Sequence, residues 1–340
     1  MAAPVKRSRI AVPRIAARSK IRPTLRGSRS RRLVCLGDLA LDIVARAETA
    51  VDAGTDVAGM VQLRIGGSAA NTCRSFADAG GKAVFIGALG DDDLGGRLSG
   101  ALRSAGVTVH AARIRGRSPR LLALVAADGE RSFVTDRGVA DLLTPGHVKP
   151  GWLARLDALH LPAYSLLRSP LADAAYTAAQ SAHAAGAFVS VDLASRRPLL
   201  ARGMRAAREL VSRAAPDVLF ANESEAAALV GRSDATSLLD LAPLVVIKLG
   251  PLGCRVIWRV HGGDIQHATV AARRIAATDT TGAGDAFDAG FLYSLIDSGY
   301  RPRAVPSMGS PNAGVLKRAA LAGHRAAAKV LTAPRKELFR

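Results

Sequence analysis

The chain has 340 residues, of which 49% are hydrophobic and 22% charged, so it can bury a substantial core in one large domain or two smaller ones. It contains no apolar run long enough to cross a bilayer, and no short apolar stretch follows the basic N-terminus as a secretory signal requires, so we expect a cytoplasmic protein. The net charge of +19 is uneven: residues 1–32 hold eleven Lys and Arg and no acid, which leaves 36 basic and 28 acidic residues on the rest of the chain, a net charge of +8.

Residues 1–32 contain three prolines and no sustained helical period, and their positive charges repel one another. We therefore predict a disordered basic N-terminal extension. Three interpretations of it stay open. It can be a dispensable extension or the product of an upstream start codon, an Arg- and Ser-rich transit peptide that directs the protein to an organelle, or an arm that binds nucleic acid.

The three cysteines, Cys35, Cys73 and Cys254, are far apart in the sequence and lie in apolar or glycine-rich surroundings. Reduced thiols that pack as small hydrophobic side chains have this pattern, whereas a disulfide framework or a zinc site needs closely spaced ligands.

The folded region is predicted to begin near residue 33, because RLVCLGDLALDIV contains a short apolar run that ends at Gly37 and Asp38. A buried parallel strand followed by a functional loop has this pattern. Farther along, helix-like and strand-like segments alternate: 169–185, 199–213 and 224–230 are expected helices, and 188–193, 218–222 and 244–250 are expected strands. This repetition predicts an α/β fold, with a doubly wound, mostly parallel sheet and helices on both faces.

Two stretches interrupt that alternation, residues 55–65 and residues 109–135. The second includes RLLALVAADGERSFVT, which is typical of two strands joined at the turn-forming pair Asp128-Gly129. We interpret the two stretches as a small β lid over the crevice where ligands bind in such folds; an ordinary surface hairpin is the alternative.

The segment ATDTTGAGDAFDAGFLYSL (277–295) places a polar turn with three small residues directly before an apolar-faced helix that begins near Ala283. Gly282, Ala283 and Gly284 allow a ligand to approach the backbone closely, and their N–H groups stand at a helix N-terminus. The helix dipole there favours an anion, so we predict an anion hole for a transferring phosphoryl group.

Asp285 follows this turn, although a carboxylate repels phosphate. A general base that takes a proton from an attacking hydroxyl explains the acid at this place, and an acid that stabilises the helix dipole is the alternative. A dinucleotide-binding fingerprint is excluded because Phe287 stands where its third glycine belongs, and the chain has no GxxxxGK[ST] loop.

Two long segments carry a family resemblance. DTTGAGDAFDAGFL (279–292) resembles the C-terminal signature of the ribokinase-like (PfkB) carbohydrate kinases at every position, and GGSAANTCRSFADAGGKAVFIGALGDDDLGG (66–96) resembles the N-terminal one. The resemblance covers residues 33–332, where it implies a ribokinase-like kinase domain with a lid, and leaves a C-terminal tail at 333–340.

The resemblance also implies the acceptor pocket. Asp42, Gly66, Gly67 and Asn71 match the positions that line the sugar or nucleoside site, together with the catalytic Asp285. Asp42 supplies acceptors and Asn71 a two-way amide, which suits paired sugar hydroxyls. A turn-forming Asp and a helix-capping Asn are the structural alternatives.

The resemblance further implies where ATP and its metal bind. Lys248, Gly250 and Gly253, from IKLGPLG (247–253), and His324 match residues on the ATP side, although a lone helix histidine more often has a packing role. Asn222 and Glu225 match the Asn-x-x-Glu that organises water-coordinated Mg²⁺, and the same spacing is that of a helix capping box.

Asp279 and Thr281 match positions that hold a monovalent cation (K⁺) in ribokinase-type members. The chain departs from the family near its end: Thr332-Ala333-Pro334-Arg335 replaces a common Gly-Ala pair, and residues 299–314 form a long loop. These departures concern the part of the chain where related kinases bind K⁺ and contact adenine.

The sequence as a whole predicts an ATP-dependent kinase that transfers the γ-phosphoryl group to a hydroxymethyl group of a sugar or sugar acid, with Asp285 as the base. A nucleoside kinase for adenosine or pseudouridine is the first alternative. A non-catalytic relative that binds a ligand or nucleic acid is the second. We also expect a homodimer through the lid.

Overall fold

The computed structural model describes Met1 and residues 31–338, apart from residues 52, 127–130, 232–233, 261–262, 278, 301–311 and 335–336. Residues 1–30 form a unit separate from residues 31–340. Residues 2–30 of the predicted basic extension, with the proposed arm for nucleic acid, lie outside the described part, and so does most of the late loop at 299–314. The predicted boundary at residue 32 is one residue too late, because the first strand begins at Arg32.

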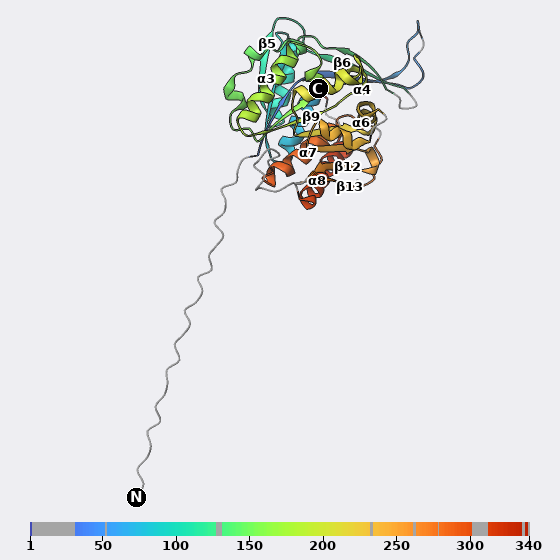
Figure 1. Cartoon of the computed structure of the whole chain (residues 1–340). Coiled ribbons are helices and arrows are strands. Elements are labelled where there is room, and N and C mark those ends of the chain that lie inside the picture. The colour runs from blue at the N-terminus through green and yellow to red at the C-terminus, as the bar shows by residue number, and fades with distance from the viewer. Residues whose placement is uncertain are drawn as a thin grey trace. The chain divides into compact units, whose positions relative to one another are not determined.

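A nine-stranded sheet, in the order β13-β12-β11-β10-β9-β8-β1-β4-β5, forms the centre of the larger unit (Figure 1). All of its pairings are parallel except the two that β12 makes with β11 and β13. The strands are β1 (Arg32–Leu36), β4 (Lys82–Gly90), β5 (Thr108–Ile114), β8 (Ala158–Pro162), β9 (Phe188–Asp192), β10 (Val218–Asn222), β11 (Leu244–Lys248), β12 (Cys254–Arg259) and β13 (Ile265–Val270).

Helices cover both faces of this sheet, as predicted. The alternation along β1 shows it: Val34 and Leu36 join one buried apolar cluster, while Leu33 and Cys35 join another on the opposite face. The helices are α1 (Ser68–Asp78), α2 (Asp93–Ser104), α3 (Leu171–Ala184), α4 (Arg196–Leu199), α5 (Gly203–Arg213), α6 (Glu223–Val230), α7 (Ala283–Asp297) and α8 (Ala313–Thr332).

Short 3₁₀ turns connect several of these elements. They are η1 (Ala140–Leu142), η2 (Pro145–His147), η3 (Pro150–Leu153), η4 (Ala163–Leu166), η5 (Ala235–Asp240) and η6 (Gly250–Leu252). All three cysteines are free and buried in the core, which confirms that they pack as small apolar side chains.

A second sheet of four strands has the order β3-β2-β6-β7. It consists of β2 (Ala40–Ala47), β3 (Gly59–Gly66), β6 (Arg120–Val125) and β7 (Arg131–Asp136), and only the β2–β6 pairing is parallel. We call these strands the small sheet. The predicted excursions thus form a separate sheet, which β2 also joins.

The sequence-based boundaries of this sheet need one correction. Residues 109–114 belong to β5, which pairs in parallel with β4 at the edge of the large sheet. Their sequence pattern resembles that of the hairpin strands that follow them. The reason is that β5 is an edge strand and is only partly buried, so apolar and polar residues alternate along it as they do in a sheet with one exposed face.

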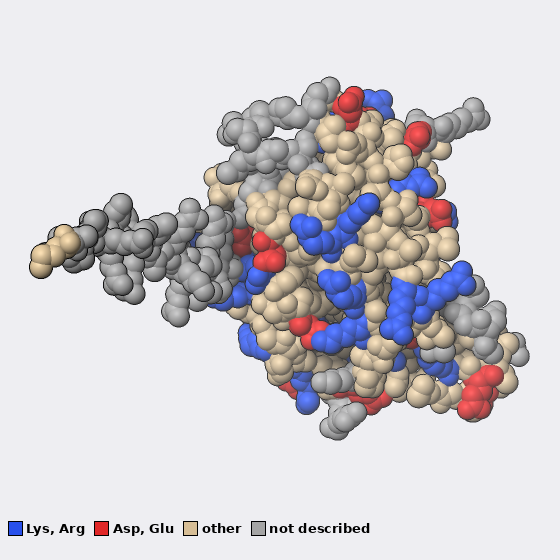
Figure 2. Space-filling view, turned by 90° about the horizontal axis from the view of Figure 1, so that it is seen from below, with Lys and Arg blue, Asp and Glu red and all other residues tan. Residues whose placement is uncertain are grey.

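The excess of basic residues extends into the described part of the chain. On the face shown in Figure 2, Lys and Arg side chains gather over the middle, and the acidic side chains lie mostly nearer the edge. None of the helices in the described ranges combines the length and the apolar character that crossing a bilayer requires.

Helices α7 and α8 pack closely at two glycines, side by side in Figure 1. A Cβ on Gly290 would lie 2.6 Å from the Ala322 carbonyl oxygen and 2.8 Å from the Ala326 Cβ, and one on Gly323 would lie 2.8 Å from the ring of Phe287. The close approach holds α7 against α8 around Phe287 and Gly290.

We predict that Gly290→Ala lowers the free energy of unfolding by about 1–3 kcal/mol, because the added methyl group forces the two helix backbones apart. Gly100→Ala in α2 is the matched control: its Cβ meets nothing within 4 Å, so it is expected to stabilise the protein by about 0.5–1 kcal/mol. Urea unfolding of both variants measures the difference, and equal stabilities would contradict the packing argument.

Candidate active site

The turn before α7 provides backbone donors beside a carboxylate. Gly282 caps the helix in the left-handed conformation, with φ 75°, which favours glycine. The Ala283 N–H donates to the Thr280 carbonyl at 3.1 Å and so belongs to the turn itself. Among the described residues, no hydrogen-bond partner is found for the N–H groups of Gly282 and Gly284. These two groups are available to an anion.

Asp285 lies in the first turn of α7 and contacts the start of α1. Its Oδ1 accepts a hydrogen bond from Ser68 Oγ at 2.6 Å, and its Oδ2 accepts one from Asn71 Nδ2 at 3.0 Å. Burial raises the pKa of Asp285 to about 6, although both hydrogen bonds act in the opposite direction. A carboxylate with this pKa can accept a proton near neutral pH.

Asp42 is held against the Gly66-Gly67 pair. A Cβ on Gly66 would lie 2.1 Å from the Asp42 carboxyl, and one on Gly67, which has φ 97°, would lie 2.4 Å from the Asp38 carbonyl oxygen. Burial raises the pKa of Asp42 to about 7, and the nearby Asp38 and Asp285 raise it further. Asp42, Asn71 and Asp285 are therefore brought together, as the resemblance implied.

Asp38 and Arg137 also belong to this region, and our residue assignments missed them. Asp38 Oδ1 is buried and has no hydrogen-bond partner within the described ranges. Arg137 Nη1 lies 3.5 Å from Asp38 Oδ2, and Arg137 Nη2 pairs with Asp141 Oδ1 at 2.7 Å. The position of Asp38 at the end of β1 was the available signal. For Arg137, after β7, the sequence offered none.

Lys248 lies under the catalytic turn. Its Nζ is 3.0 Å from Asp192 Oδ1 and 3.1 Å from Asp288 Oδ2, and a Cβ on Gly284 would come within 3.4 Å of it. Burial lowers the pKa of Lys248, but the carboxylates of Asp192 and Asp288 raise it by more, so the ammonium stays charged. Sequence reasoning identified neither Asp192 nor Asp288 as a partner of this lysine.

Asn222 and Glu225 form the capping box of α6. Asn222 Oδ1 accepts from the Glu225 N–H, and Glu225 Oε2 accepts from the Asn222 N–H, both at 2.8 Å. Burial, and then the nearby Asp192, raise the pKa of Glu225. The capping role is therefore present, and it does not exclude a role near Mg²⁺. The described residues contain no group of three His, Cys, Asp or Glu placed to hold a metal ion directly.

Two of the residues assigned to the ATP side, Gly253 and His324, lie against the end of β13. Gly253, with φ 111°, lies so close to the Val270 carbonyl oxygen that a Cβ there would be 2.1 Å from it. His324 Nε2 lies 3.1 Å from the same oxygen, and its ring is 5.1 Å from that of Phe287. Gly250 has φ 57° in the adjoining turn. His324 thus packs α8 against β13, as the structural alternative expected; its contact with adenine stays a prediction.

The loop before the catalytic turn contains the residues assigned to a monovalent cation. Asp279 Oδ1 accepts from the Thr281 N–H at 3.0 Å. Asp279 Oδ2 accepts from Arg64 Nη1 at 2.6 Å. The carboxylate is therefore already paired with a guanidinium of β3, and this arrangement does not fit K⁺ at the same carboxylate.

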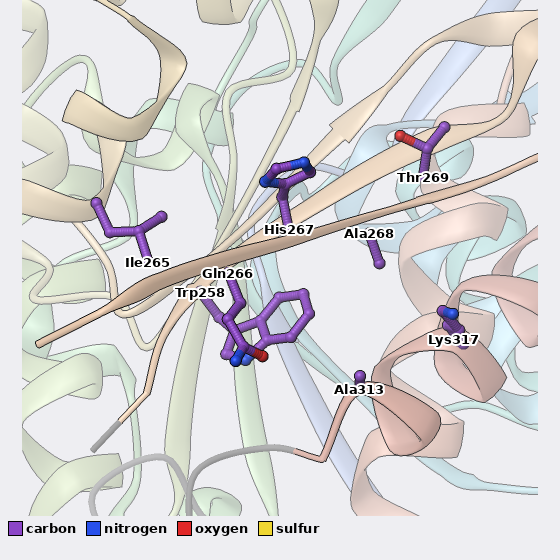
Figure 3. Close-up of a pocket in the computed structure, with 8 residues that line it drawn as sticks. All are labelled: Trp258, Ile265, Gln266, His267, Ala268, Thr269, Ala313 and Lys317. Carbon is purple, nitrogen blue, oxygen red and sulfur yellow. The ribbon is translucent and has the colours of Figure 1, made fainter. Parts of the chain in front are cut away.

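A separate cavity of about 400 Å³ lies between β13 and the first turns of α8. Figure 3 shows Gln266 and Ala268 pointing to the side of β13 on which α8 lies, while His267 points away. Trp258 pairs with Leu244 at the start of β11, so the cavity is remote from the Lys248 end of that strand. It is lined by Trp258, Ile265, Gln266, His267, Ala268, Thr269, Ala313 and Lys317.

A mostly parallel α/β sheet with a carboxylate, a buried ammonium and two amides that have no partner among the described residues is compatible with a small-molecule phosphotransferase. The model of the pfkB family carbohydrate kinases matches residues 30–336. The chain belongs to this family, and it is a phosphotransferase that acts on a sugar hydroxyl.

Individual relatives agree. The chain is 32% identical over 243 residues to fructokinase-2 of Solanum lycopersicum, covering 68% of this chain and 73% of the relative. It is 32% identical over 278 residues to the ATP-dependent ribose-1-phosphate kinase of Halopiger xanaduensis, covering 81% and 88%.

Solved structures give the same fold. Adenosine kinase from Sinorhizobium meliloti superposes with a TM-score of 0.72 at 26% identity, covering 91% of this chain and 97% of that one. Fructokinase with bound ATP from Xylella fastidiosa superposes with a TM-score of 0.73 at 25% identity, covering 89% and 93%. The ribokinase-like fold predicted from the sequence is confirmed.

We predict that kcat/KM is constant above the pKa of Asp285, about 6, and falls about tenfold per pH unit below it, because a protonated carboxyl cannot act as a base. Ser68→Ala removes a hydrogen bond to the carboxylate, so the pKa of Asp285 rises further and the acid limb moves to higher pH. Ser75→Ala, on the same helix, is the control that leaves the limb in place.

Asp42, with a pKa of about 7, titrates in the same range. The Ser68 variant separates the two groups because Ser68 donates to Asp285. A pH profile that Ser68→Ala leaves unchanged would argue against Asp285 as the titrating base.

Proposed function

We propose that the protein transfers the γ-phosphoryl group of ATP to a primary hydroxyl of a free sugar, with Asp285 as the general base. The observation that carries this proposal is the position of Asp285, above the ammonium of Lys248 and beside the amides of Gly282 and Gly284, which have no partner in the described part of the chain. A proton acceptor for the attacking hydroxyl and donors for the transferring phosphoryl group are then close together.

In the proposed reaction the Asp285 carboxylate removes the proton of the sugar hydroxyl as its oxygen attacks the γ-phosphorus. The bond from that phosphorus to the β,γ-bridging oxygen breaks, and ADP leaves with the electron pair. The Gly282 and Gly284 amides and Lys248 stabilise the charge that develops. Mg²⁺ bound with ATP would be held through water by Asn222 and Glu225, and it would neutralise phosphate charge.

Fructose or a closely related ketose is the acceptor we favour. Asp38 has a buried, unpartnered carboxylate oxygen, Asp42 is enclosed beside it, and Asn71 completes a set that can bind several hydroxyl groups. Curated relatives at 30–32% identity bear the name fructokinase. Arg137 lies 3.5 Å from Asp38, and its guanidinium can pair with the carboxylate of a sugar acid, so a sugar acid stays among the proposed acceptors.

A nucleoside is the second candidate. The adenosine kinase of similar fold points to it, and Phe133 lies on the same face of the small sheet as Asp42, with its side chain 57% exposed. A single exposed ring gives a base only one surface for stacking, so we rank this acceptor below a sugar.

We further propose that the small sheet acts as a lid and forms a homodimer. Val61, Leu122 and Val134 share the face opposite Asp42 and are 63%, 37% and 68% exposed. Apolar side chains grouped in this way are typical of an interface. Sedimentation measures the mass directly, and a monomer would contradict this proposal.

We also propose that the protein is located in the cytoplasm, because all three thiols are free.

We predict that Asp285→Asn lowers kcat by about 10²–10⁴-fold, because the amide keeps the shape of the side chain but cannot accept the proton. Calorimetry should show ATP binding nearly unchanged, which separates lost chemistry from misfolding. Asp297→Asn, in the exposed last turn of the same helix, is the control. Near-normal turnover of the Asp285 variant would refute the assignment.

A panel of fructose, ribose, ribose-1-phosphate, 2-keto-3-deoxygluconate, adenosine and pseudouridine, each with MgATP, tests the acceptor. We expect one free sugar to be preferred by about 10²-fold or more in kcat/KM, because a missing hydroxyl leaves buried polar groups unpaired. Asp42→Ala should reduce turnover of that sugar most. Turnover of a nucleoside and of no free sugar would make the second candidate correct.

A further inference from the structure

The Arg64–Asp279 ion pair joins the small sheet to the loop before the catalytic turn. Arg64 Nη1 lies 2.6 Å from Asp279 Oδ2, and both side chains are 12% exposed. The other oxygen of Asp279 accepts the Thr281 N–H. Asp279 thus stands three residues before Gly282 and is bonded on both sides.

The guanidinium is also fixed from its own side. Its Nη2 donates to Gln62 Oε1 on the same strand. Arg64 pairs in register with Asp42 of β2, so both side chains lie on the same face of the small sheet. The strand that carries Arg64 therefore also positions a residue of the acceptor pocket.

A second cation reinforces the first. Arg46 Nη2 lies 4.0 Å from the same Asp279 oxygen. Two guanidinium groups thus face one carboxylate, and they repel any further cation that approaches it. An enclosed carboxylate needs a compensating charge, and here the protein itself supplies it.

We propose that Arg64 replaces a monovalent cation beside the catalytic turn, so that this kinase needs no K⁺ and instead holds its turn in place through the position of the small sheet. The proposal rests on the function proposed above. Arg64 is a positioning residue that acts on Gly282 and Gly284 through Asp279. Its guanidinium can pair with Asp279 only when the small sheet lies against the loop before the turn.

The test compares the whole protein in potassium chloride and in choline chloride at the same ionic strength, about 0.1 M. Wild type should turn over sugar equally in both salts and show the same Tm in both. Arg64→Ala should lose about 10–100-fold in kcat in choline, because the turn shifts, with a smaller change in KM for sugar. Potassium should restore part of this loss and raise the Tm of the variant.

Two further variants make the result specific. Arg64→Lys keeps one positive charge and should stay independent of potassium. Arg120→Ala removes another arginine of the small sheet, one that faces Asp92 at 3.7 Å, and it should show neither the loss nor the rescue.

Three outcomes overturn the proposal: activation of wild type by potassium more than about twofold, normal turnover of Arg64→Ala in choline, or a loss of activity in that variant that potassium does not reduce. Wild type that phosphorylates no acceptor in either salt contradicts the proposed function instead. In that case the potassium-specific change in Tm of Arg64→Ala still decides the role of Arg64.

Discussion

The accumulation of negative charge beneath the N-terminal turn of α7 is the constraint on which the site depends. Asp285 and Asp288 share that helix; burial raises the pKa of both, and Asp192 at the end of β9 raises them further. Three carboxylates so close would repel one another and any phosphate. The ammonium of Lys248, between Asp192 and Asp288, and the positive end of the helix dipole offset this repulsion. The site can therefore be acidic enough to supply a base and still attract an anion.

Close backbone approach is the second requirement, and glycines meet it at the points where separate elements converge. The carboxyl group of Asp42 occupies the volume that a side chain on Gly66 would fill. Gly290 lets α8 lie against α7, so α8 supports the middle of the helix that carries Asp285. The small sheet adds Asp42 and Arg64 from one face, and Arg64 is bonded to Asp279 in the loop before α7, so one sheet contacts both sides of the candidate site.

The helices and strands that could be predicted from the sequence were those with a local pattern of apolar and polar residues. The alternation of helices and strands from 169 to 250 was confirmed because each element buries its own apolar stripe. The partners of β5 were assigned wrongly because strand pairing is non-local, and an edge strand in either sheet has a similar pattern. The turn and helix around Asp285 were located because the glycines, the acid and the helix are adjacent in sequence; the catalytic role of Asp285 stays a prediction.

By itself, the sequence determined the fold class and the family, and it located the glycine-rich turn before α7 and the acid that follows it, because these features depend on neighbouring residues or on long continuous signatures. Only the tertiary structure decided which charges meet. Lys248 and its two aspartates lie on three different elements, and Arg64 and Asp279 are 215 positions apart. Electrostatic energy depends on the distance between charges in space and on their burial, and neither can be derived from the order of the residues in the sequence.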